Sequence, residues 1–419
     1  MSHDLPSSAA QKLRIVHFSD KNGRIQVIFP ETRLLNLDAV FSATQRRFRP
    51  IYHRREQDNN RLKPNTQTLI DQEVFQCDLL AIQNSAGNGY ETLSSDTLKQ
   101  RFAGPLNYID DFCIELGRVP QPVTHHKDDE QQLRQALGEF KAARVTQRLE
   151  ETLEMPALSA TCRRIILLCA NPKADAEELC KIINLDPSLA AQVMSWASSP
   201  YYGTNNKVDS IEDAIIRVVG FDLVLNLALG LSIGASIEPP KNGPRHFQEF
   251  WLDAVSHAIL MDILVQKVPP ERRPQKGHAY LVGLLHNFGY LILGSVLTPY
   301  FSALSRQHEA NPHLPANTIE MFTLGFTQQQ LAFRQLQQWQ LPDSVCTAIR
   351  YSTQPEYQDE HAPLTKLLHL AQQIYRQQEV PLALVKDLGL TPADTESAYQ
   401  QLLASSAYLQ IMANLIKKQ

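Results

Sequence analysis

The stretch LVGLLHNFGYLIL, residues 281–293, is an apolar helical run interrupted by one polar pair, His286 and Asn287. A histidine followed directly by an aspartate on such a helix would supply two metal ligands, because imidazole nitrogen and carboxylate oxygen both coordinate divalent cations. Asn287 is instead a neutral amide, whose carbonyl oxygen is a weaker ligand. The chemistry of the protein therefore depends on whether metal binding survives this one change.

Composition places the chain among ordinary globular proteins with more than one domain. Its length of 419 residues exceeds the roughly 250–300 residues at which a single core stops growing. A hydrophobic content of 43% with 20% charged residues excludes a disordered or fibrous class. The net charge of −4 gives no global attraction to phosphate backbones, so nucleic-acid binding would need a local basic patch.

Cysteine usage and the first residues predict a cytoplasmic protein. The six cysteines are scattered singly, without a CxxC pair, which indicates buried thiols in a reducing compartment. The opening MSHDLPSSAAQKLR lacks the charged and apolar regions of a signal peptide. The apolar residues 224–237 fall short of the roughly 18–20 residues that span a bilayer. We therefore expect a buried helix there and no membrane association.

Patterns along the chain predict four segments. Residues 1–117 combine strand-like and short helical runs, with a hairpin turn at Asn22-Gly23, and are expected to form a small α+β domain. Residues 118–152 begin as a Pro-rich, charged linker and continue as a polar helix that connects or clasps the domains. Residues 153–389 are expected to be all-helical, with C-terminal helices from 390–419 packed on them.

Helix-start signals are dense in the third segment. Asp175 and Ser210 each precede an acidic residue by three positions, which is a capping-box pattern. Asp186 precedes Pro187, which places a proline at the first helical position, and Gly220 is typical of a helix end. These signals predict a series of short helices.

Spaced motifs in this helical segment resemble the HDOD domain, a bacterial output module related to HD phosphohydrolases. They begin with MPALSATCRRIILLCANPKADAEELCKIINLDPSLAAQVMSWASSPYYG and DSIEDAIIRVVG, and continue with FWLDAVSHAIL, LVGLLHNFGYLIL and LGFTQQQLAFRQLQQWQLPDSVCTAIRY. The resemblance covers about Leu153–Gly389. It implies an all-α, HD-like domain and a role in bacterial signal transduction.

An HD hydrolase uses imidazole and carboxylate ligands to hold one or two divalent metals, which lower the pKa of a bound water. On that pattern, the degenerate site positions of this chain are Asp253, His257, His286, Asn287 and Gln372. The outer histidine positions fall on Gln328 and on Ser352-Thr353. Neutral amides thus replace two carboxylates that would offset a dication, so we expect no metal, no cofactor and no hydrolysis.

Two alternatives remain open. Asp253 and His257 lie one helical turn apart and, with His286, would be the ligands of a divergent metal-dependent HD phosphohydrolase. The basic run TQRRFRPIYHRREQDNNRLKP would instead contact RNA or tRNA, because cations interleaved with aromatic rings suit single strands. The candidate contacts are Arg46, Arg47, Arg49, Arg54 and Arg55. Such charge runs are more often solvated surface, and a lone buried histidine is more often a core residue.

Residues 12–102 show a weaker resemblance to the YbaK-type aminoacyl-tRNA deacylases, carried by FPETRLLNLDAV and the segment after it. No lysine matches the catalytic lysine of that family, so the resemblance implies a degenerate sensor or tRNA-like binding domain. We therefore predict a cytosolic bacterial signal-transduction protein. Its α+β domain is tethered to a non-catalytic HDOD module that acts through protein or ligand binding, and its partner is expected to be a signalling protein.

Overall fold

The computed structural model divides the chain into two compact units. The amino-terminal unit contains Met1–Pro122 and Ser302–Gly325, and the helical unit contains Val123–Phe301 and Phe326–Gln419. The structure describes residues 10–51, 60–63, 66–83, 89–104, 107–140, 158–169, 171, 173–198, 208–235, 247–354, 356–406 and 409–410. The predicted multidomain organisation, an α+β domain followed by a helical domain, is confirmed.

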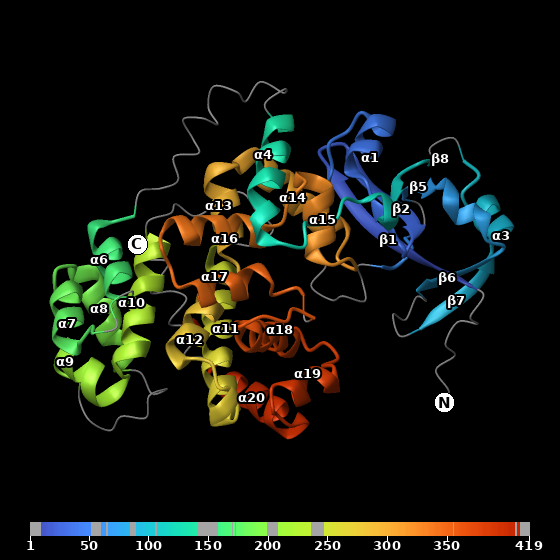
Figure 1. Ribbon diagram of the computed structural model, residues 1–419. Helices are drawn as coiled ribbons and strands as arrows, with labels where there is room; N and C mark the ends of the chain where they lie inside the picture. Colours follow the sequence, from blue (N-terminus) through green and yellow to red (C-terminus); the bar gives the residue numbers. More distant parts are fainter. Residues whose placement is uncertain are drawn as a thin grey trace. The chain divides into compact units, whose positions relative to one another are not determined.

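The amino-terminal unit is built on a mixed sheet in the strand order β7-β6-β1-β2-β5-β8, with β4 paired to β1 (Figure 1). A second, two-stranded sheet pairs β3 with β9. The strands are β1 (Gln11–Asp20), β2 (Gly23–Pro30), β3 (Arg33–Leu35), β4 (Arg49–Pro50), β5 (Gln67–Asp71), β6 (Leu79–Gln83), β7 (Tyr90–Ser94), β8 (Tyr108–Asp110) and β9 (Cys113–Glu115). Its helices are α1 (Leu37–Thr44), α3 (Ser95–Arg101), α15 (Ala316–Leu324), most of α14 (Thr298–Ala310), and the short η1 (Gln72–Gln76) and η2 (Leu116–Arg118).

The predicted hairpin at Asn22-Gly23 forms, with a shifted turn. Asp20 pairs with Gly23, so the two-residue loop is Lys21-Asn22. Gly23 adopts φ +134°, a conformation that a side chain would strain, whereas Asn22 stays at negative φ. β6 and β7 also pair antiparallel, with Leu79 opposite Ser94 and Gln83 opposite Tyr90.

Both faces of this sheet are buried, as the alternation along β1 and β2 requires. Phe18 and Val27 belong to one core cluster, which α14 joins through Ala310. Ile15 and Ile28 belong to the cluster on the other face. Because successive residues of a strand point to opposite faces, each strand contributes to both cores.

Residues 302–325 belong to the amino-terminal unit, although the sequence pattern predicted them within the helical segment 153–389. Asn311 Oδ1 accepts from the Leu35 backbone N–H at 2.7 Å, and its amide returns a bond to the Leu35 carbonyl at 3.1 Å. Gln307 donates to the same carbonyl. These bonds satisfy the backbone at the end of β3, which a helical repeat alone does not reveal. The domain boundaries drawn from the sequence otherwise stay a prediction.

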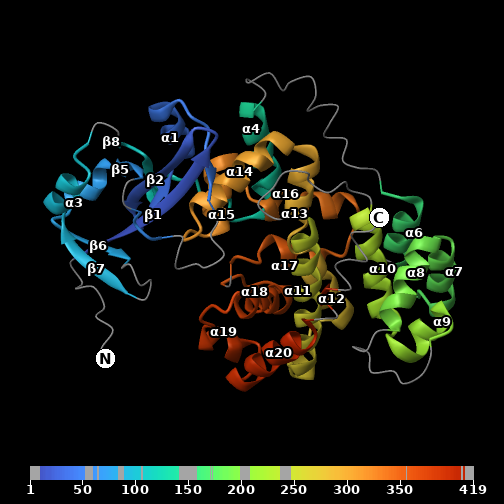
Figure 2. The ribbon, with the colours of Figure 1, turned by 180° about the vertical axis from the view of Figure 1, so that it is seen from behind.

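The helical unit consists of helices that pack against one another. They are α4 (Asp129–Phe140), α6 (Ala160–Cys169), α7 (Ala176–Asn184), α8 (Pro187–Ala197), α9 (Ile211–Asp213), α10 (Phe221–Ala235), α11 (Phe247–Lys267), α12 (Lys276–Leu285), α13 (Phe288–Val296), α16 (Gln328–Gln338), α17 (Asp343–Arg350), α18 (Ala362–Tyr375), α19 (Leu382–Asp387) and α20 (Pro392–Ala404). Short turns add η3 (His126–Asp128), a π-helical η6 (Ala214–Val218) and η7 (Pro270–Arg272). α11 packs on α12, α18 and α20, and Figure 2 shows it among them from behind.

The predicted helix starts are confirmed. Asp175 caps α7 by accepting from the Glu178 N–H at 2.8 Å. Asp186 caps α8, whose first residue is Pro187. Ser210 caps α9 in the same way. Each cap satisfies a backbone donor that the helix itself leaves unpaired.

One stretch of the helical unit, Gly277–Val296, is long and apolar enough to cross a membrane, but 83% of it is buried inside the protein. Its apolar side chains are therefore accounted for by the core of the helical unit, as for the buried α10. All six cysteines are free thiols, and Cys162 and Cys346 are buried.

Candidate functional site

The His286-Asn287 pair lies at the junction between two helices, because α12 ends at Leu285 and α13 begins at Phe288. Both side chains are buried, with exposed fractions of 4% and 2%. The apolar run is therefore broken where its two polar residues stand, and both point into the helical unit rather than into solvent.

Glycines before and after this pair bring the neighbouring helices close. A Cβ on Gly283 would lie 2.6 Å from the His257 carbonyl oxygen and 2.6 Å from the Ala258 Cα. A Cβ on Gly289 would lie 2.1 Å from the Gln328 carbonyl oxygen. Both positions require glycine because the obstacle is backbone. The two glycines stand in the sequence as GLLHNFG, but no local pattern shows that they face the backbone of other helices.

The close approach of α12 to α11 assembles a cluster from Asp253, His257 and His286. Each side chain offers one potential ligand atom, and these atoms lie within 4.8 Å of one another. The two imidazole rings lie 4.1 Å apart between centroids. Three of the five positions singled out from the sequence are thus brought together, and Asn287 joins them.

His286 is held in one orientation by the backbone. Its Nδ1 lies 2.7 Å from the Gly283 carbonyl oxygen, and since a carbonyl only accepts, Nδ1 carries a hydrogen. Its Nε2 lies 3.3 Å from Asp253 Oδ2. That contact is attractive when Nε2 carries a proton, or when a cation lies between the two atoms.

His257 is neutral near pH 7. Burial, followed by the neighbouring charge of His286, lowers the pKa of His257 to about 3. Its Nδ1 donates to the Asp253 carbonyl oxygen at 2.8 Å, because a carbonyl oxygen only accepts. Its buried Nε2 has no hydrogen-bond partner among the described residues, and its ring packs against Tyr375 of α18, with 4.5 Å between centroids.

Asn287 turns its amide toward the carboxylate of the cluster. Its Nδ2 donates to Asp253 Oδ2 at 2.9 Å and to the Phe250 carbonyl oxygen at 3.4 Å. The oxygen of Asp253 that faces His286 is therefore the one that already accepts from the amide. An aspartate at 287 would present an acceptor where the asparagine presents a donor.

The remaining predicted positions are also neutral. Gln328 begins α16, and its Nε2 donates to the His286 carbonyl oxygen at 3.3 Å. Gln372 is buried in α18, one turn before Tyr375. The Ser352 carbonyl oxygen accepts from His369 Nδ1 at 2.9 Å. The cluster consequently holds two imidazoles and one carboxylate, which accepts from an amide N–H.

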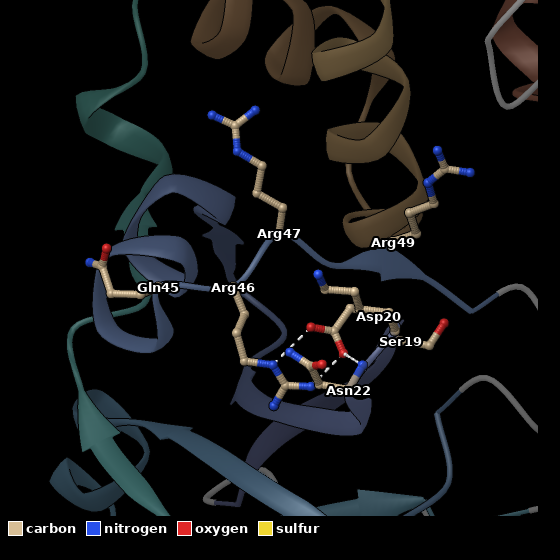
Figure 3. A pocket seen from close by; sticks show the side chains of 8 residues that line it. Ser19, Asp20, Asn22, Gln45, Arg46, Arg47 and Arg49 are labelled. Atoms are coloured by element: carbon tan, nitrogen blue, oxygen red, sulfur yellow. Dashed lines mark hydrogen bonds and ion pairs between the residues drawn. The ribbon is translucent and has the colours of Figure 1, made fainter.

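The predicted nucleic-acid contacts lie in the amino-terminal unit. Arg46, Arg47 and Arg49 line a pocket beside the β1–β2 turn (Figure 3). Arg54 and Arg55 lie outside the described residues. Whether any of these arginines contacts nucleic acid stays a prediction.

A buried ion pair at the start of α4 was not foreseen. Arg350 Nε and Nη2 donate to the two carboxylate oxygens of Asp129 at 2.5 and 2.7 Å, and both side chains are at most 3% exposed. Gln330 donates to Asp129 Oδ1 at 2.7 Å. This pair anchors the predicted connecting helix to α17, and no local pattern links residues 221 positions apart.

Comparisons with known proteins agree with this fold. The HDOD domain family matches residues 155–355. A crystal structure from Marinobacter aquaeolei VT8, provisionally described as a signal transduction protein, is 32% identical and covers 99% of this chain and 95% of that one, with a TM-score of 0.87. A provisionally assigned phosphohydrolase from Shewanella amazonensis SB2B shares the fold, at 17% identity and a TM-score of 0.52 over 64% of this chain and 97% of that one.

An uncharacterized protein of Treponema pallidum is 21% identical over 236 residues, or 56% of this chain. The match spans 44% of that curated relative. The family match, the structural likeness over the whole chain and the helical architecture around His286 agree with one another. The chain belongs to the HDOD domain family.

Proposed function

We propose that this protein is a non-catalytic regulatory protein of bacterial signal transduction, whose HDOD module acts by binding a protein partner or a ligand. The observation that carries the proposal is the hydrogen bond from Asn287 Nδ2 to Asp253 Oδ2 at 2.9 Å. It occupies the one carboxylate of the cluster with a donor from the same chain. The fold is stabilised by packing that does not require a metal, so the scaffold persists without the chemistry.

Charge supports the proposal. A dication bound by Asp253, His257 and His286 would meet one formal negative charge, and Asn287 and Gln372 add none. The cost of removing a dication from water is offset mainly by anionic ligands and by hydrogen bonds that orient those ligands. Here the amide of Asn287 would have to turn away before Asp253 Oδ2 could bind a metal.

The relative from Marinobacter aquaeolei VT8 supports a signalling role, because it matches nearly the whole chain and is provisionally described as a signal transduction protein. A cytosolic location and a protein partner belong to the same proposal. The six free thiols support a reducing compartment. The degenerate deacylase-like character of the amino-terminal unit stays a prediction.

Metal analysis of the purified full-length chain tests the proposal. After incubation with Mn²⁺, Fe²⁺ or Zn²⁺ and desalting, we expect well under one metal per chain and no cleavage of a chromogenic phosphodiester. His286→Ala should leave both readings unchanged. Stoichiometric metal together with phosphodiester cleavage that His286→Ala abolishes would establish the rival function instead.

That rival, a divergent metal-dependent phosphohydrolase, is favoured by one observation. Two imidazoles and a carboxylate lie within 4.8 Å, and such a set suits transition metals. His257→Gln and Asp253→Asn would then lower metal content in parallel with activity. Under our proposal these variants alter stability alone, because the residues serve as packing and hydrogen-bonding groups.

A further inference from the structure

A cationic pocket of about 510 Å³ lies at the turn between β1 and β2 (Figure 3). The turn contributes one wall, and the segment after α1, which leads into β4, contributes the other. The lining residues are Ser19, Asp20, Lys21, Asn22, Gln45, Arg46, Arg47 and Arg49. Four cationic side chains and one carboxylate leave this pocket with a net charge of +3.

Arg46 is the structural member of the set. Its Nε and Nη2 donate to the two carboxylate oxygens of Asp20 at 2.8 and 2.5 Å, and its Nη1 donates to Gln67 Oε1 at 3.3 Å. The Arg46 guanidinium holds the pKa of Asp20 down at about 2. The one carboxylate of the pocket is thus committed to Arg46, which also stacks on Phe48 at 4.6 Å.

Arg47 and Arg49 differ from Arg46 in the direction of their side chains. They flank Phe48, which is 8% exposed and belongs to the core with Phe18. Since side chains alternate along an extended segment, the two arginines stand on the side opposite Phe48. In Figure 3 both extend away from the Asp20–Arg46 pair. β4 pairs Arg49 with Ser19 of β1, which fixes the position of this edge.

Neither arginine has a carboxylate within ion-pair distance among the residues that the structure describes, and neither does Lys21. Other arginines of the amino-terminal unit do: Arg14 pairs with Glu31 at 3.5 Å, and Arg33 pairs with Glu73 at 2.6 Å. Arg47, Arg49 and Lys21 thus place three positive charges without a described carboxylate at ion-pair distance around one concave site.

The carboxyl end of α1 would oppose an anion here if its carbonyls were free. Local hydrogen bonds occupy several of them. The Phe41 carbonyl oxygen accepts from the Gln45 backbone N–H, the Ser42 carbonyl oxygen from Gln45 Nε2 at 2.9 Å, and the Val40 carbonyl oxygen from Thr44 Oγ1 at 2.7 Å. The local bonds reduce the negative potential at this helix end.

We propose that this pocket binds the phosphate groups of a nucleotide-sized small molecule, with Arg47 and Arg49 as the anion-binding residues and Ser19 and Asn22 as neutral donors. Arginine suits this role because its guanidinium donates in a fork that matches phosphate oxygens and keeps its charge. The site lies in the other unit from the Asp253 cluster, so the inference does not rest on the proposed function.

Size and charge distribution favour a small ligand over a polymer. The volume falls within the range of roughly 300–1,000 Å³ that small-molecule pockets occupy. The pocket itself gathers four cationic side chains, a smaller set than the extended basic face that a nucleic-acid backbone requires.

Calorimetric titration of the full-length chain with ADP tests the inference, with adenosine as the matched probe that lacks phosphate. We expect ADP to bind and adenosine not to bind. Arg47→Ala and Arg49→Ala should each weaken ADP binding about fivefold to tenfold, since a charge-assisted contact contributes roughly 1–1.5 kcal/mol. Raising the salt concentration should weaken it further.

Arg118→Ala is the control, because Arg118 is exposed, pairs with Glu115 at 3.8 Å and lies outside the pocket; ADP affinity should not change. Arg46 is not substituted, since its removal would leave Asp20 without its ion-pair partner. Titration with a single-stranded RNA of mixed sequence shows whether the pocket binds a nucleic-acid polymer instead of a small molecule. No ADP binding at millimolar concentration, equal binding of adenosine, or RNA binding without ADP binding would each overturn the inference.

Discussion

Replacing Asn287 by aspartate restores the adjacent His-Asp pair and tests the electrostatic reasoning directly. In the wild-type chain the amide donates to Asp253 Oδ2 at 2.9 Å. In Asn287→Asp a carboxylate oxygen takes the place of that donor, so two negative charges meet at a similar distance. Asp253 is 20% exposed, so water screens the repulsion only in part.

The expected destabilisation can be bounded in two ways. Two unit charges about 2.9 Å apart repel by roughly 6 kcal/mol at an effective dielectric constant of ~20. The pair can instead take up a proton, and protonating a carboxyl of ordinary pKa near 3.9 at pH 7 costs about 4 kcal/mol. With partial screening by water, we expect Asn287→Asp to lose about 2–4 kcal/mol of unfolding free energy at pH 7.

A divalent cation should recover much of this loss in the variant alone, because it would meet two carboxylates and two imidazoles. Binding at a hundred times the dissociation constant stabilises by about 2.7 kcal/mol. Urea denaturation with 1 mM MnCl₂ or with EDTA gives the comparison. Asn287→Ala, which removes the hydrogen bond without adding charge, is the control and should show no metal effect.

Two results would refute this reasoning. If MnCl₂ stabilises the wild-type chain as much as the Asn287→Asp variant, the native cluster already holds a metal. If Asn287→Asp is as stable as wild type in EDTA at pH 7, the carboxylates do not meet, and the geometry of the cluster is wrong.

Three further predictions concern other contacts. Gly283→Ala should lower the free energy of unfolding by about 1–3 kcal/mol, because the alanine Cβ would lie 2.6 Å from the backbone of α11. The control is Gly138→Ala, whose Cβ would have nothing within 4 Å and should leave stability unchanged or raise it. Denaturant titration measures both. Asp129→Asn should cost about 3–5 kcal/mol, because it leaves Arg350 buried without its charge partner; Glu130→Gln at the exposed pair with Arg134 should change stability little, and equal effects would contradict the buried geometry. Burial, with a smaller effect of Arg14, lowers the pKa of His313 to about 4. Between that pH and the ordinary pKa near 6.5, the unfolded chain binds more protons than the folded chain. The free energy of unfolding should therefore fall by up to about 3 kcal/mol as the pH drops through this window. His313→Gln should flatten that pH dependence in unfolding curves, and an unchanged slope would show that His313 does not contribute.

Local patterns predicted the elements whose causes are local. Caps at Asp175, Asp186 and Ser210 mark helix starts because they satisfy backbone donors a few residues away. The hairpin at Gly23 follows from a backbone angle that glycine tolerates. The family resemblance rested on such motifs in order, and its match to residues 155–355 lies within the segment that they delimited.

The sequence by itself determined the residue types of the site: one carboxylate, two imidazoles and an amide where an acid would stand. Only the tertiary structure decided what they do, because His257 and His286 come from helices that meet through Gly283. The direction of the Asn287 amide, the Asp129–Arg350 pair and the attachment of Asn311 to β3 are likewise contacts between distant residues. Their energies depend on distance, burial and orientation, which no run of neighbouring residues specifies.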